Sequence, residues 1–251
     1  MAQPEEAAPR ERGLSFGSVA AEYAALRPGY PADAVRFLTG DRPRRVLDLG
    51  AGTGLLTDVL VAVGHRVLAV DPSPEMLGQL VARQPGTAAL AGAAEALPLA
   101  DGSVEVVVAG QAAHWFAPAA AAAEMRRVLR PGGVVGLLWH VRDDRIPWVS
   151  RLSELMAGEG LAGVHERVVA AFATELDAEV VTAESAVVQR LSVDGVVRRM
   201  ATSSYVIGMD DARRGAFLHD VRELVSTHPD TRGQATVGLG YRTLAFRLTP
   251  R

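Results

Sequence analysis

Cysteine, lysine and asparagine are absent from this chain of 251 residues, so its basic side chains are all arginines or histidines. Without cysteine it can form no disulfide, no zinc-thiolate site and no thiolate nucleophile. Without lysine it has neither the amine of a Schiff-base enzyme nor the lysine of a phosphate-binding P-loop. Covalent catalysis through sulfur or a side-chain amine is therefore excluded.

Long apolar runs and blocks of one charge sign are also lacking. No stretch approaches the roughly 18 uncharged apolar residues that a membrane span needs, and the polar start at residues 1–13 is unlike a signal peptide. The formal net charge is −3 without a basic block, which does not suggest a nucleic-acid footprint. We expect a soluble cytoplasmic protein with no nucleic-acid or membrane partner.

The hydrophobic pattern predicts one α/β domain behind a flexible tail at residues 1–13. An apolar content of 49% is enough for one full core. Seven strands are predicted, at 44–49, 66–70, 88–91, 103–110, 133–140, 179–191 and 234–248. Helices are predicted at 15–26, 32–38, 54–63, 74–84, 117–129, 146–156, 162–176, 193–203 and 210–226. Such alternation predicts a mostly parallel sheet with right-handed crossovers.

Two local patterns add detail to this scheme. Ser73 stands directly before Pro74, which favours a helix N-terminus with Ser73 as its cap. Gly238 and Gly240 interrupt the last predicted strand, whose apolar residues alternate only loosely. Because glycine weakens the interior of a strand, this strand suits an edge hairpin or bulge better than a central position.

The most informative segment is a short aliphatic run at 46–49 that leads into glycines at alternate positions, Gly50, Gly52 and Gly54. The chain must leave a buried strand, turn tightly and open a helix, with no side chains where a ligand would lie. Asp71 ends the next strand, in the place of the ribose-binding carboxylate of doubly wound folds. Together these features predict a nucleoside-binding site.

The spacing of the glycines selects the ligand. A dinucleotide-binding loop has the pattern G-x-G-x-x-G and holds a pyrophosphate at a helix N-terminus. Here the pattern is Asp48-x-Gly50-x-Gly52-x-Gly54, with a carboxylate at the start of the loop. That carboxylate would repel a diphosphate but attracts a ligand that carries an ammonium and a sulfonium group. S-adenosylmethionine is such a ligand, and we expect it as the cofactor.

With these motifs the chain resembles the class I S-adenosylmethionine-dependent methyltransferases of type 11 that carry a His-Trp-Phe signature, a group that includes trans-aconitate methyltransferase-like proteins. The segments that carry the resemblance are 16–31, 46–54, 70–77, 92–99, 110–116, 125–133 and 138–143. It implies a Rossmann-like α/β fold: a doubly wound, seven-stranded, mostly parallel sheet with an antiparallel edge hairpin, N-terminal cap helices and a helical insertion. It also implies one domain at 14–251, with cap helices (14–40), a cofactor-binding core (41–145) and acceptor-pocket helices with the last two strands (146–251).

In this family the glycine loop cradles the methionine part of the cofactor, and the acid after the second strand holds the ribose hydroxyls. The loop at 92–98 lies against adenine, where Ala93 replaces a polar side chain and leaves backbone groups, Ala94 or Glu95 to contact the base. Arg27 either clamps the cofactor's carboxylate or pairs with a surface acid. The residues assigned to S-adenosylmethionine are Tyr23, Arg27, Asp48, Gly50, Ala51, Gly52, Gly54, Asp71, Pro72, Met76, Ala93, Ala94, Glu95 and Gln111.

The resemblance places the acceptor beside the loop after the fourth strand. His114, with an ordinary pKa near 6.5, either takes a proton from an acceptor hydroxyl or orders the loop. His140 stands where the family more often has asparagine, and either tunes acceptor choice or is a neutral change. The residues assigned to the acceptor pocket are Tyr30, His114, Trp115, Trp139 and His140, with His114 and His140 as candidate catalytic bases. The other histidines, His65, His165, His219 and His228, are expected to be exposed, and no metal site is expected.

We therefore expect transfer of the methyl group of S-adenosylmethionine to a small-molecule acceptor, with S-adenosylhomocysteine as the product. Methylation of a carboxylate or hydroxyl oxygen is favoured over methylation of nitrogen or carbon. Two alternatives stay open: a cyclase or isomerase that binds the same cofactor without consuming it, and a nucleic-acid methyltransferase. The expected assembly is a monomer or a homodimer.

Overall fold

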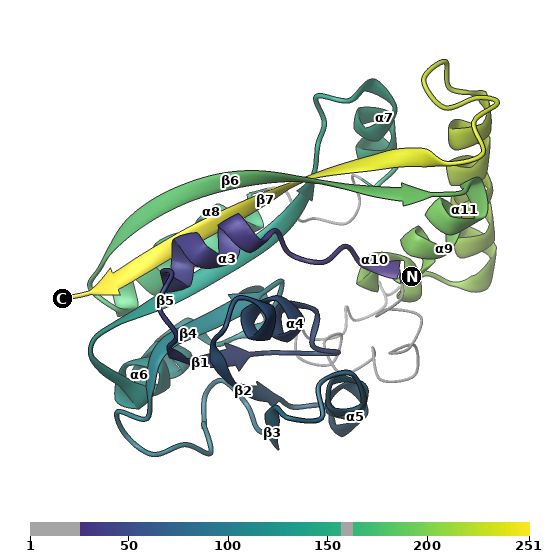
Figure 1. The fold of residues 1–251 in the computed structure, drawn as a ribbon. Helices are drawn as coiled ribbons and strands as arrows, with labels where there is room; N and C mark the ends of the chain where they lie inside the picture. Colours follow the sequence, from purple (N-terminus) through teal and green to yellow (C-terminus); the bar gives the residue numbers. More distant parts are fainter. Residues whose placement is uncertain (1–25, 157–162) are drawn as a thin grey trace, which may run out of the picture.

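The computed structural model describes residues 26–156 and 163–251, and one seven-stranded sheet runs through them (Figure 1). The predicted tail, most of the first predicted helix and Tyr23 lie outside the described residues. The strands are β1 (Arg45–Leu49), β2 (Arg66–Asp71), β3 (Ala88–Ala91), β4 (Val104–Gly110), β5 (Leu129–Arg142), β6 (Ala178–Leu191) and β7 (Val237–Pro250). Each of the seven predicted strands is confirmed.

The helices of the described residues follow the predicted positions from residue 32 onward. They are α3 (Ala32–Thr39), α4 (Leu55–Ala62), α5 (Pro74–Arg83), α6 (Pro118–Val128), α7 (Pro147–Leu155), α8 (Val164–Glu175), α9 (Val193–Ala201), α10 (Ser204–Ile207) and α11 (Asp211–Thr227), with a 3-10 turn, η2 (Ala113–Trp115). The helix predicted at 193–203 ends at Ala201, and α10 follows it as a separate short helix. In this part of the chain no helix is long and apolar enough to cross a membrane.

The sheet has the strand order β3-β2-β1-β4-β5-β7-β6. Every pairing between two of the strands β1 to β5 is parallel, whereas β7 is antiparallel to both β5 and β6. The expected Rossmann-like α/β class, mostly parallel with an antiparallel pair at one edge, is confirmed. The strand order reverses between β1 and β4, and doubly wound sheets bind ligands outside the carboxyl ends of their strands at this point.

The last strand belongs to the antiparallel pair at the sheet edge, as predicted, but it is the inner member of that pair. β7 is an inner strand between β5 and β6, and β6 is the outermost strand. The glycines of β7 lie where neighbouring side chains come close to its backbone, because a Cβ on Gly240 would lie 2.4 Å from Cδ1 of Ile146. A Cβ on Gly238 would lie 3.0 Å from Cγ1 of Val188. Pairing with β6 continues through both glycines, so they admit neighbouring side chains without ending the strand.

β5 begins at Leu129, earlier than the predicted start at residue 133. Leu129 already pairs with Val104 of β4, and a register shift follows before the regular parallel ladder begins. Gly132 has a φ of 75°, which a side chain would disfavour. The predicted helix therefore passes into the strand through an irregular segment that belongs to the sheet.

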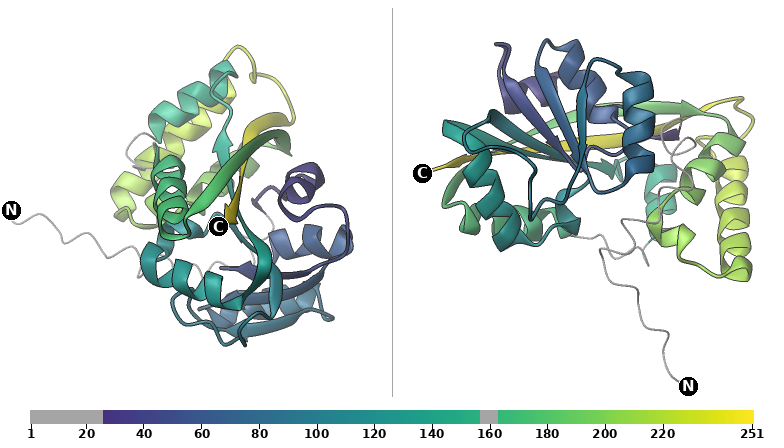
Figure 2. Two further views of the ribbon diagram at one scale, coloured as in Figure 1. Left: turned by 90° about the vertical axis from the view of Figure 1, so that its left-hand side faces the viewer. Right: turned by 90° about the horizontal axis from the view of Figure 1, so that it is seen from below.

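Helices cover both faces of the sheet (Figure 2), and alternate residues of the central strands belong to the buried clusters on the two faces. α3 and α4 cover one face, where they bury Val46 and Val106. α6 and α8 cover the other face, where Leu47 and Val107 share a buried cluster with Phe172. α5 packs over β2 and β3, and Arg83 at its end forms an ion pair with Asp58 of α4. Both faces are thus closed, and ligand access is confined to the ends of the strands.

The end of β6 and the start of β7 reach a second group of helices, α7, α9, α10 and α11 (Figure 1). Trp148 of α7, Met200 of α9 and Phe217 of α11 share a buried cluster with Tyr241 of β7. This lobe brings the turn between α9 and α10, with Ser203, to the carboxyl edge of the sheet.

Of the four histidines predicted to be exposed, His219 alone is open to solvent, with 73% of its side chain exposed. His65 is buried, and its Nε2 lies 2.7 Å from Oγ1 of Thr39. The side chains of His165 and His228 are only 16% and 15% exposed. These predictions are wrong because local periodicity does not reveal which distant element covers a side chain.

Candidate functional site

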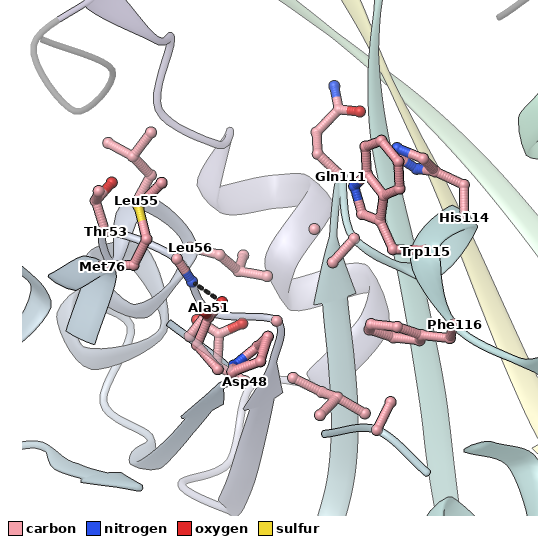
Figure 3. Close-up of a pocket in the computed structure, with 18 of the residues that line it drawn as sticks. Asp48, Ala51, Thr53, Leu55, Leu56, Met76, Gln111, His114, Trp115 and Phe116 are labelled. Atoms are coloured by element: carbon pink, nitrogen blue, oxygen red, sulfur yellow. Dashed lines mark hydrogen bonds between the residues drawn. The ribbon is translucent and has the colours of Figure 1, made fainter. Parts of the chain in front are cut away.

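A cavity of about 440 Å³ opens at the carboxyl ends of β1, β2 and β4 (Figure 3). That volume lies in the range of cofactor and small-molecule sites. Thr53, Leu55 and Met76 lie on one side of it, and Gln111 and His114 lie on the other. The described residues contain no cluster of three or more His, Asp or Glu side chains that could hold a metal ion.

The loop after β1 supplies backbone groups to the cavity. Gly50 and Gly52 have φ values of 69° and 55°, a region that side chains disfavour. The N–H of Gly50 donates to the carbonyl of Val70 over 2.8 Å and ties the loop to β2. A Cβ on Gly50 would lie 2.5 Å from Cβ of Ala112, whereas one on Gly52 would meet no protein atom within 4 Å. Gly52 therefore borders open space.

Asp71, at the end of β2, is fixed by the loops on either side of it. Its Oδ2 accepts from the N–H of Gly52 over 2.8 Å, and its Oδ1 accepts from the N–H of Ser73 over 2.9 Å. Burial raises the pKa of Asp71, while the two backbone hydrogen bonds oppose that rise. Ser73 caps α5 as predicted, because its Oγ accepts from the N–H of Met76 over 3.3 Å. The carboxylate is therefore held in a fixed orientation at the cavity.

Asp48 is a buried carboxyl group at the floor of the cavity, with 1% of its surface exposed. Its Oδ2 accepts from Oγ1 of Thr57 over 2.6 Å, while Oδ1 has no hydrogen-bond partner among the described residues. Burial, with a contribution from the charge of the neighbouring Asp71, raises the pKa of Asp48 to about 7. A buried acceptor without a partner beside a cavity is suited to a cationic or hydrogen-bond-donating ligand group.

His114 lies in η2 and is hydrogen-bonded to Trp139, whose Nε1 donates to Nδ1 of His114 over 3.4 Å. Burial lowers the pKa of His114 to about 4, so the expectation of an ordinary pKa is wrong and the ring is neutral at physiological pH. A neutral imidazole has one N–H, so an accepting Nδ1 leaves the hydrogen on Nε2. The free nitrogen of His114 is then a donor.

His140, near the end of β5, lies behind Tyr30. The two rings are stacked, with centroids 4.5 Å apart and an interplanar angle of 20°. Gln111 joins the cavity wall to this layer, because its Nε2 donates to the backbone carbonyl of His140 over 3.0 Å. Burial lowers the pKa of His140 to about 3, and the charges of Arg199 and Arg27 contribute to that shift.

Comparison with known proteins gives the family. The sequence model of a protein family described as a methyltransferase domain matches residues 47–137. An uncharacterized methyltransferase-like protein of Schizosaccharomyces pombe is 31% identical over 246 residues, which cover 92% of this chain and 94% of the relative. An uncharacterized methyltransferase of Mycobacterium tuberculosis is 42% identical over 243 residues, which cover 96% of this chain and 97% of the relative. The chain belongs to the class I S-adenosylmethionine-dependent methyltransferases.

Solved structures agree on the fold of the methyltransferase. A protein of Anaeromyxobacter dehalogenans, assigned as a type II methyltransferase, is 25% identical, has a TM-score of 0.65, and is matched over 89% of this chain and 97% of its own. The [4+2]-cyclase SpnF is 15% identical, with a TM-score of 0.55. Likeness at that level shows the fold alone. The predicted similarity to trans-aconitate methyltransferase stays a prediction.

The residues around the cavity of the methyltransferase fit S-adenosylmethionine. Asp48 offers a carboxylate oxygen without a partner among the described residues, which suits a cationic ligand. Asp71 stands at the carboxyl end of the neighbouring strand, where doubly wound folds bind ribose hydroxyls. Gly52 leaves space that a side chain would fill. The family implies the cofactor, and this donor set agrees with it.

Most of the predicted cofactor residues meet at the cavity. Those that border it are Arg27, Asp48, Gly50, Ala51, Gly52, Asp71, Pro72, Met76, Ala93, Ala94, Glu95 and Gln111. Gly54 does not: a Cβ on Gly54 would lie 2.7 Å from Cγ of Leu80, so the missing side chain lets α4 and α5 pack. Arg27 donates from Nη2 to the backbone carbonyl of Thr202 over 3.1 Å.

The predicted acceptor residues are divided between three places. Tyr30, His114 and Trp115 border the cavity. Trp139 is 5% exposed and lies in the core behind His114, so its assignment to the pocket wall is wrong. His140 borders only a smaller neighbouring cavity. The wall is thus made by the loop after β4, and the aromatic residue of β5 supports it from behind.

Several cavity residues were not predicted. They are Leu49, Thr53, Leu55, Leu56, Gly92, Gly110, Ala112, Phe116, Ser203 and Ser204. Phe116 completes the His-Trp-Phe motif and could have been assigned from it. Leu55 and Leu56 look like core residues of an amphipathic helix, so their pattern does not distinguish a lining role. Ser203 and Ser204 come from a distant turn that no local pattern connects to the cavity.

Proposed function

We propose that the methyltransferase transfers the methyl group of S-adenosylmethionine to an oxygen of a small molecule, with a carboxylate as the favoured acceptor and a hydroxyl as the alternative. The hydrogen bond from Trp139 to His114 carries this proposal. It leaves His114 a donor that is neutral at physiological pH, and such a group cannot take a proton from a hydroxyl. A carboxylate is already ionised, needs no base and accepts from such a donor.

S-adenosylmethionine supplies a methyl group that its sulfonium already activates. The protein's part is therefore to bind, orient and exclude water. Asp71 binds the ribose hydroxyls, and Asp48 faces the positive charge of the cofactor. Leu56, Trp115 and Phe116 make the wall apolar and keep water from the reacting atoms. His114 orients the acceptor through Nε2–H. The acceptor is a free small molecule, and a monomer or homodimer in the cytoplasm stays the predicted context.

Methyl-labelled cofactor and two matched acceptor sets, carboxylic acids and hydroxyl compounds, test the proposal. We expect base-labile label in the acids with one S-adenosylhomocysteine per methyl ester. At saturating cofactor the single-turnover rate should be flat between about pH 6 and 8, because carboxylates are ionised throughout. Base-stable label in the hydroxyl set would contradict the carboxylate assignment. Turnover of an acceptor without consumption of the cofactor would point to a cyclase or isomerase, and label in bulk RNA to a nucleic-acid enzyme.

Asp48 should make the affinity for S-adenosylmethionine depend on pH. Its pKa is raised to about 7, so the carboxyl is protonated in the free protein below that pH and ionised above it. A cationic ligand favours the ionised form, so the affinity should rise with pH towards about 7, by up to about tenfold per pH unit, and level off beyond it. Calorimetry on Asp48→Asn should give a flat profile between about pH 5.5 and 7.

The same shift has a consequence for the free protein. The folded-state pKa of Asp48 is above the ordinary aspartate value of 3.8, so folding binds a proton between the two values. The stability of the free protein should therefore fall as pH rises through this window, relative to Asp48→Asn. Asp41→Asn is the matched control, since its side chain is 89% exposed. An affinity profile in Asp48→Asn as steep as in the unsubstituted protein would exclude Asp48 from this role.

A further inference from the structure

A side cavity of about 20 Å³ adjoins the main one. The two cavities share Arg27, Tyr30, Leu55 and Gln111. His140 and Arg199 border only the smaller one. Its volume is enough for a single water-sized group. It can therefore take one terminal atom of a ligand whose other atoms lie in the main cavity.

His140 has an unsatisfied nitrogen at this place. Its Nδ1 lies 2.9 Å from Oγ1 of Thr243, and its ring is stacked on Tyr30. Its Nε2 is buried and has no hydrogen-bond partner among the residues that the structure describes. Buried polar atoms are nearly always satisfied in folded proteins. The side cavity therefore lacks one polar group that a ligand can supply.

Two guanidinium groups make the same place positive. Arg199 of α9 is 6% exposed, and its guanidinium carbon lies 5.8 Å from the centroid of the Tyr241 ring. Arg27 is held by its hydrogen bond to the carbonyl of Thr202. Both charges act on the imidazole of His140. A small space between cations and a neutral imidazole matches an oxygen of a carboxylate, which arginine recognises through its planar fork.

We propose that the side cavity is a carboxylate subsite in which Arg199 and His140 hold one oxygen of the acceptor's carboxylate. This inference rests on the proposed function and adds the residues that bind the acceptor's carboxylate. The second oxygen then faces the main cavity beside Gln111 and Tyr30. That oxygen forms the new O–C bond while the C–S bond of the cofactor breaks and its electron pair goes to sulfur. The anion becomes a neutral ester, so its attraction to Arg199 is lost and the product is released.

The cofactor's own amino-acid carboxylate has the same chemistry, so the test must distinguish the two sources. The full chain, labelled with ¹⁵N-histidine and saturated with S-adenosylhomocysteine, is titrated with sodium acetate and, separately, with sodium chloride at equal ionic strength. The His140 signal is assigned by its loss in His140→Gln. We expect acetate, and not chloride, to move this signal and to raise the pKa of His140, because a nearby anion favours the imidazolium.

Substitutions on α9 identify the binding group. Arg199→Met should weaken acetate binding about tenfold or more, the effect of losing a charge-assisted hydrogen bond. Arg198→Met is the matched control, because Arg198 is the exposed neighbour on the same helix, and it should bind acetate as the unsubstituted protein does. Arg199→Lys keeps the charge without the fork and should give an intermediate affinity.

Three results would overturn the inference. The first is an acetate titration that leaves the His140 signal of the unsubstituted protein unchanged. The second is equal acetate affinity in the unsubstituted protein and in Arg199→Met, or in Arg199→Lys should the methionine variant not fold. The third is a loss of S-adenosylhomocysteine affinity in Arg199→Met that parallels the loss for acetate, which would assign the subsite to the cofactor. All three are binding measurements, so they are independent of whether an ester forms.

Discussion

Replacing Asp71 with alanine should weaken the binding of S-adenosylhomocysteine by about 1.5 to 3 kcal/mol, roughly 10- to 160-fold, the scale of hydrogen bonds to a charged group. Asp71 ends β2 beside the strand-order reversal and borders the cavity. Its loss removes the acceptor for the ribose hydroxyls and the anchor of two loops, since Gly52 and Ser73 both donate to it. Calorimetry on the purified variant measures the change.

Two further variants separate binding from folding. Asp71→Asn keeps one carbonyl oxygen and should retain one of the two backbone hydrogen bonds. Its affinity for S-adenosylhomocysteine should therefore lie between that of the unsubstituted protein and that of Asp71→Ala. Asp41→Ala removes a carboxylate that is 89% exposed and should change neither affinity nor stability. Unfolding of each ligand-free variant gives the structural part of the loss. Unchanged affinity in a folded Asp71→Ala would remove this residue from the cofactor site.

The half of the site that binds the cofactor could be predicted because its chemistry is local in sequence. Asp48, the glycine loop and Asp71 lie at or directly after the ends of two adjacent strands, so the turn and the ligand contacts are specified by neighbouring residues. The cap of α5 was predictable for the same reason, since Ser73 needs only the N–H of Met76 three residues later. Alternation of strands and helices likewise fixed the sheet class.

The acceptor half could not be predicted as well because distant elements determine it. The pKa of His114 depends on the burial of its ring. The tautomer of His114 depends on the hydrogen bond from Trp139, a residue of β5. Ser203 reaches the cavity from the lobe that packs on the ends of β6 and β7. β7 lies between β5 and β6, and its Gly240 leaves room for the side chain of Ile146. Each of these features is a contact between segments that are far apart in sequence.

Gly52 and Gly54 belong to one motif but should give opposite results when replaced by alanine. At Gly54, with a φ of 87°, the new Cβ would lie 2.7 Å from Cγ of the buried Leu80. Left-handed strain of about 1 to 2 kcal/mol and overpacking of about 1 to 3 kcal/mol should together lower the free energy of unfolding by about 2 to 5 kcal/mol. At Gly52 the Cβ meets no protein atom within 4 Å, so only the strain should be felt.

Ligand binding should show the reverse order. Gly52 borders the cavity and Gly54 does not, so the methyl group of Gly52→Ala occupies cofactor space and should cost about 1 to 3 kcal/mol of S-adenosylhomocysteine affinity. Urea unfolding and calorimetry on both variants give the two free energies. Gly78→Ala is the matched control: Gly78 lies inside α5 with open space around its Cα, and alanine there should stabilise the helix by up to about 1 kcal/mol. A stable Gly54→Ala that no longer binds the ligand would return Gly54 to the cofactor site, because the helix contact would then not be the reason for glycine at that position.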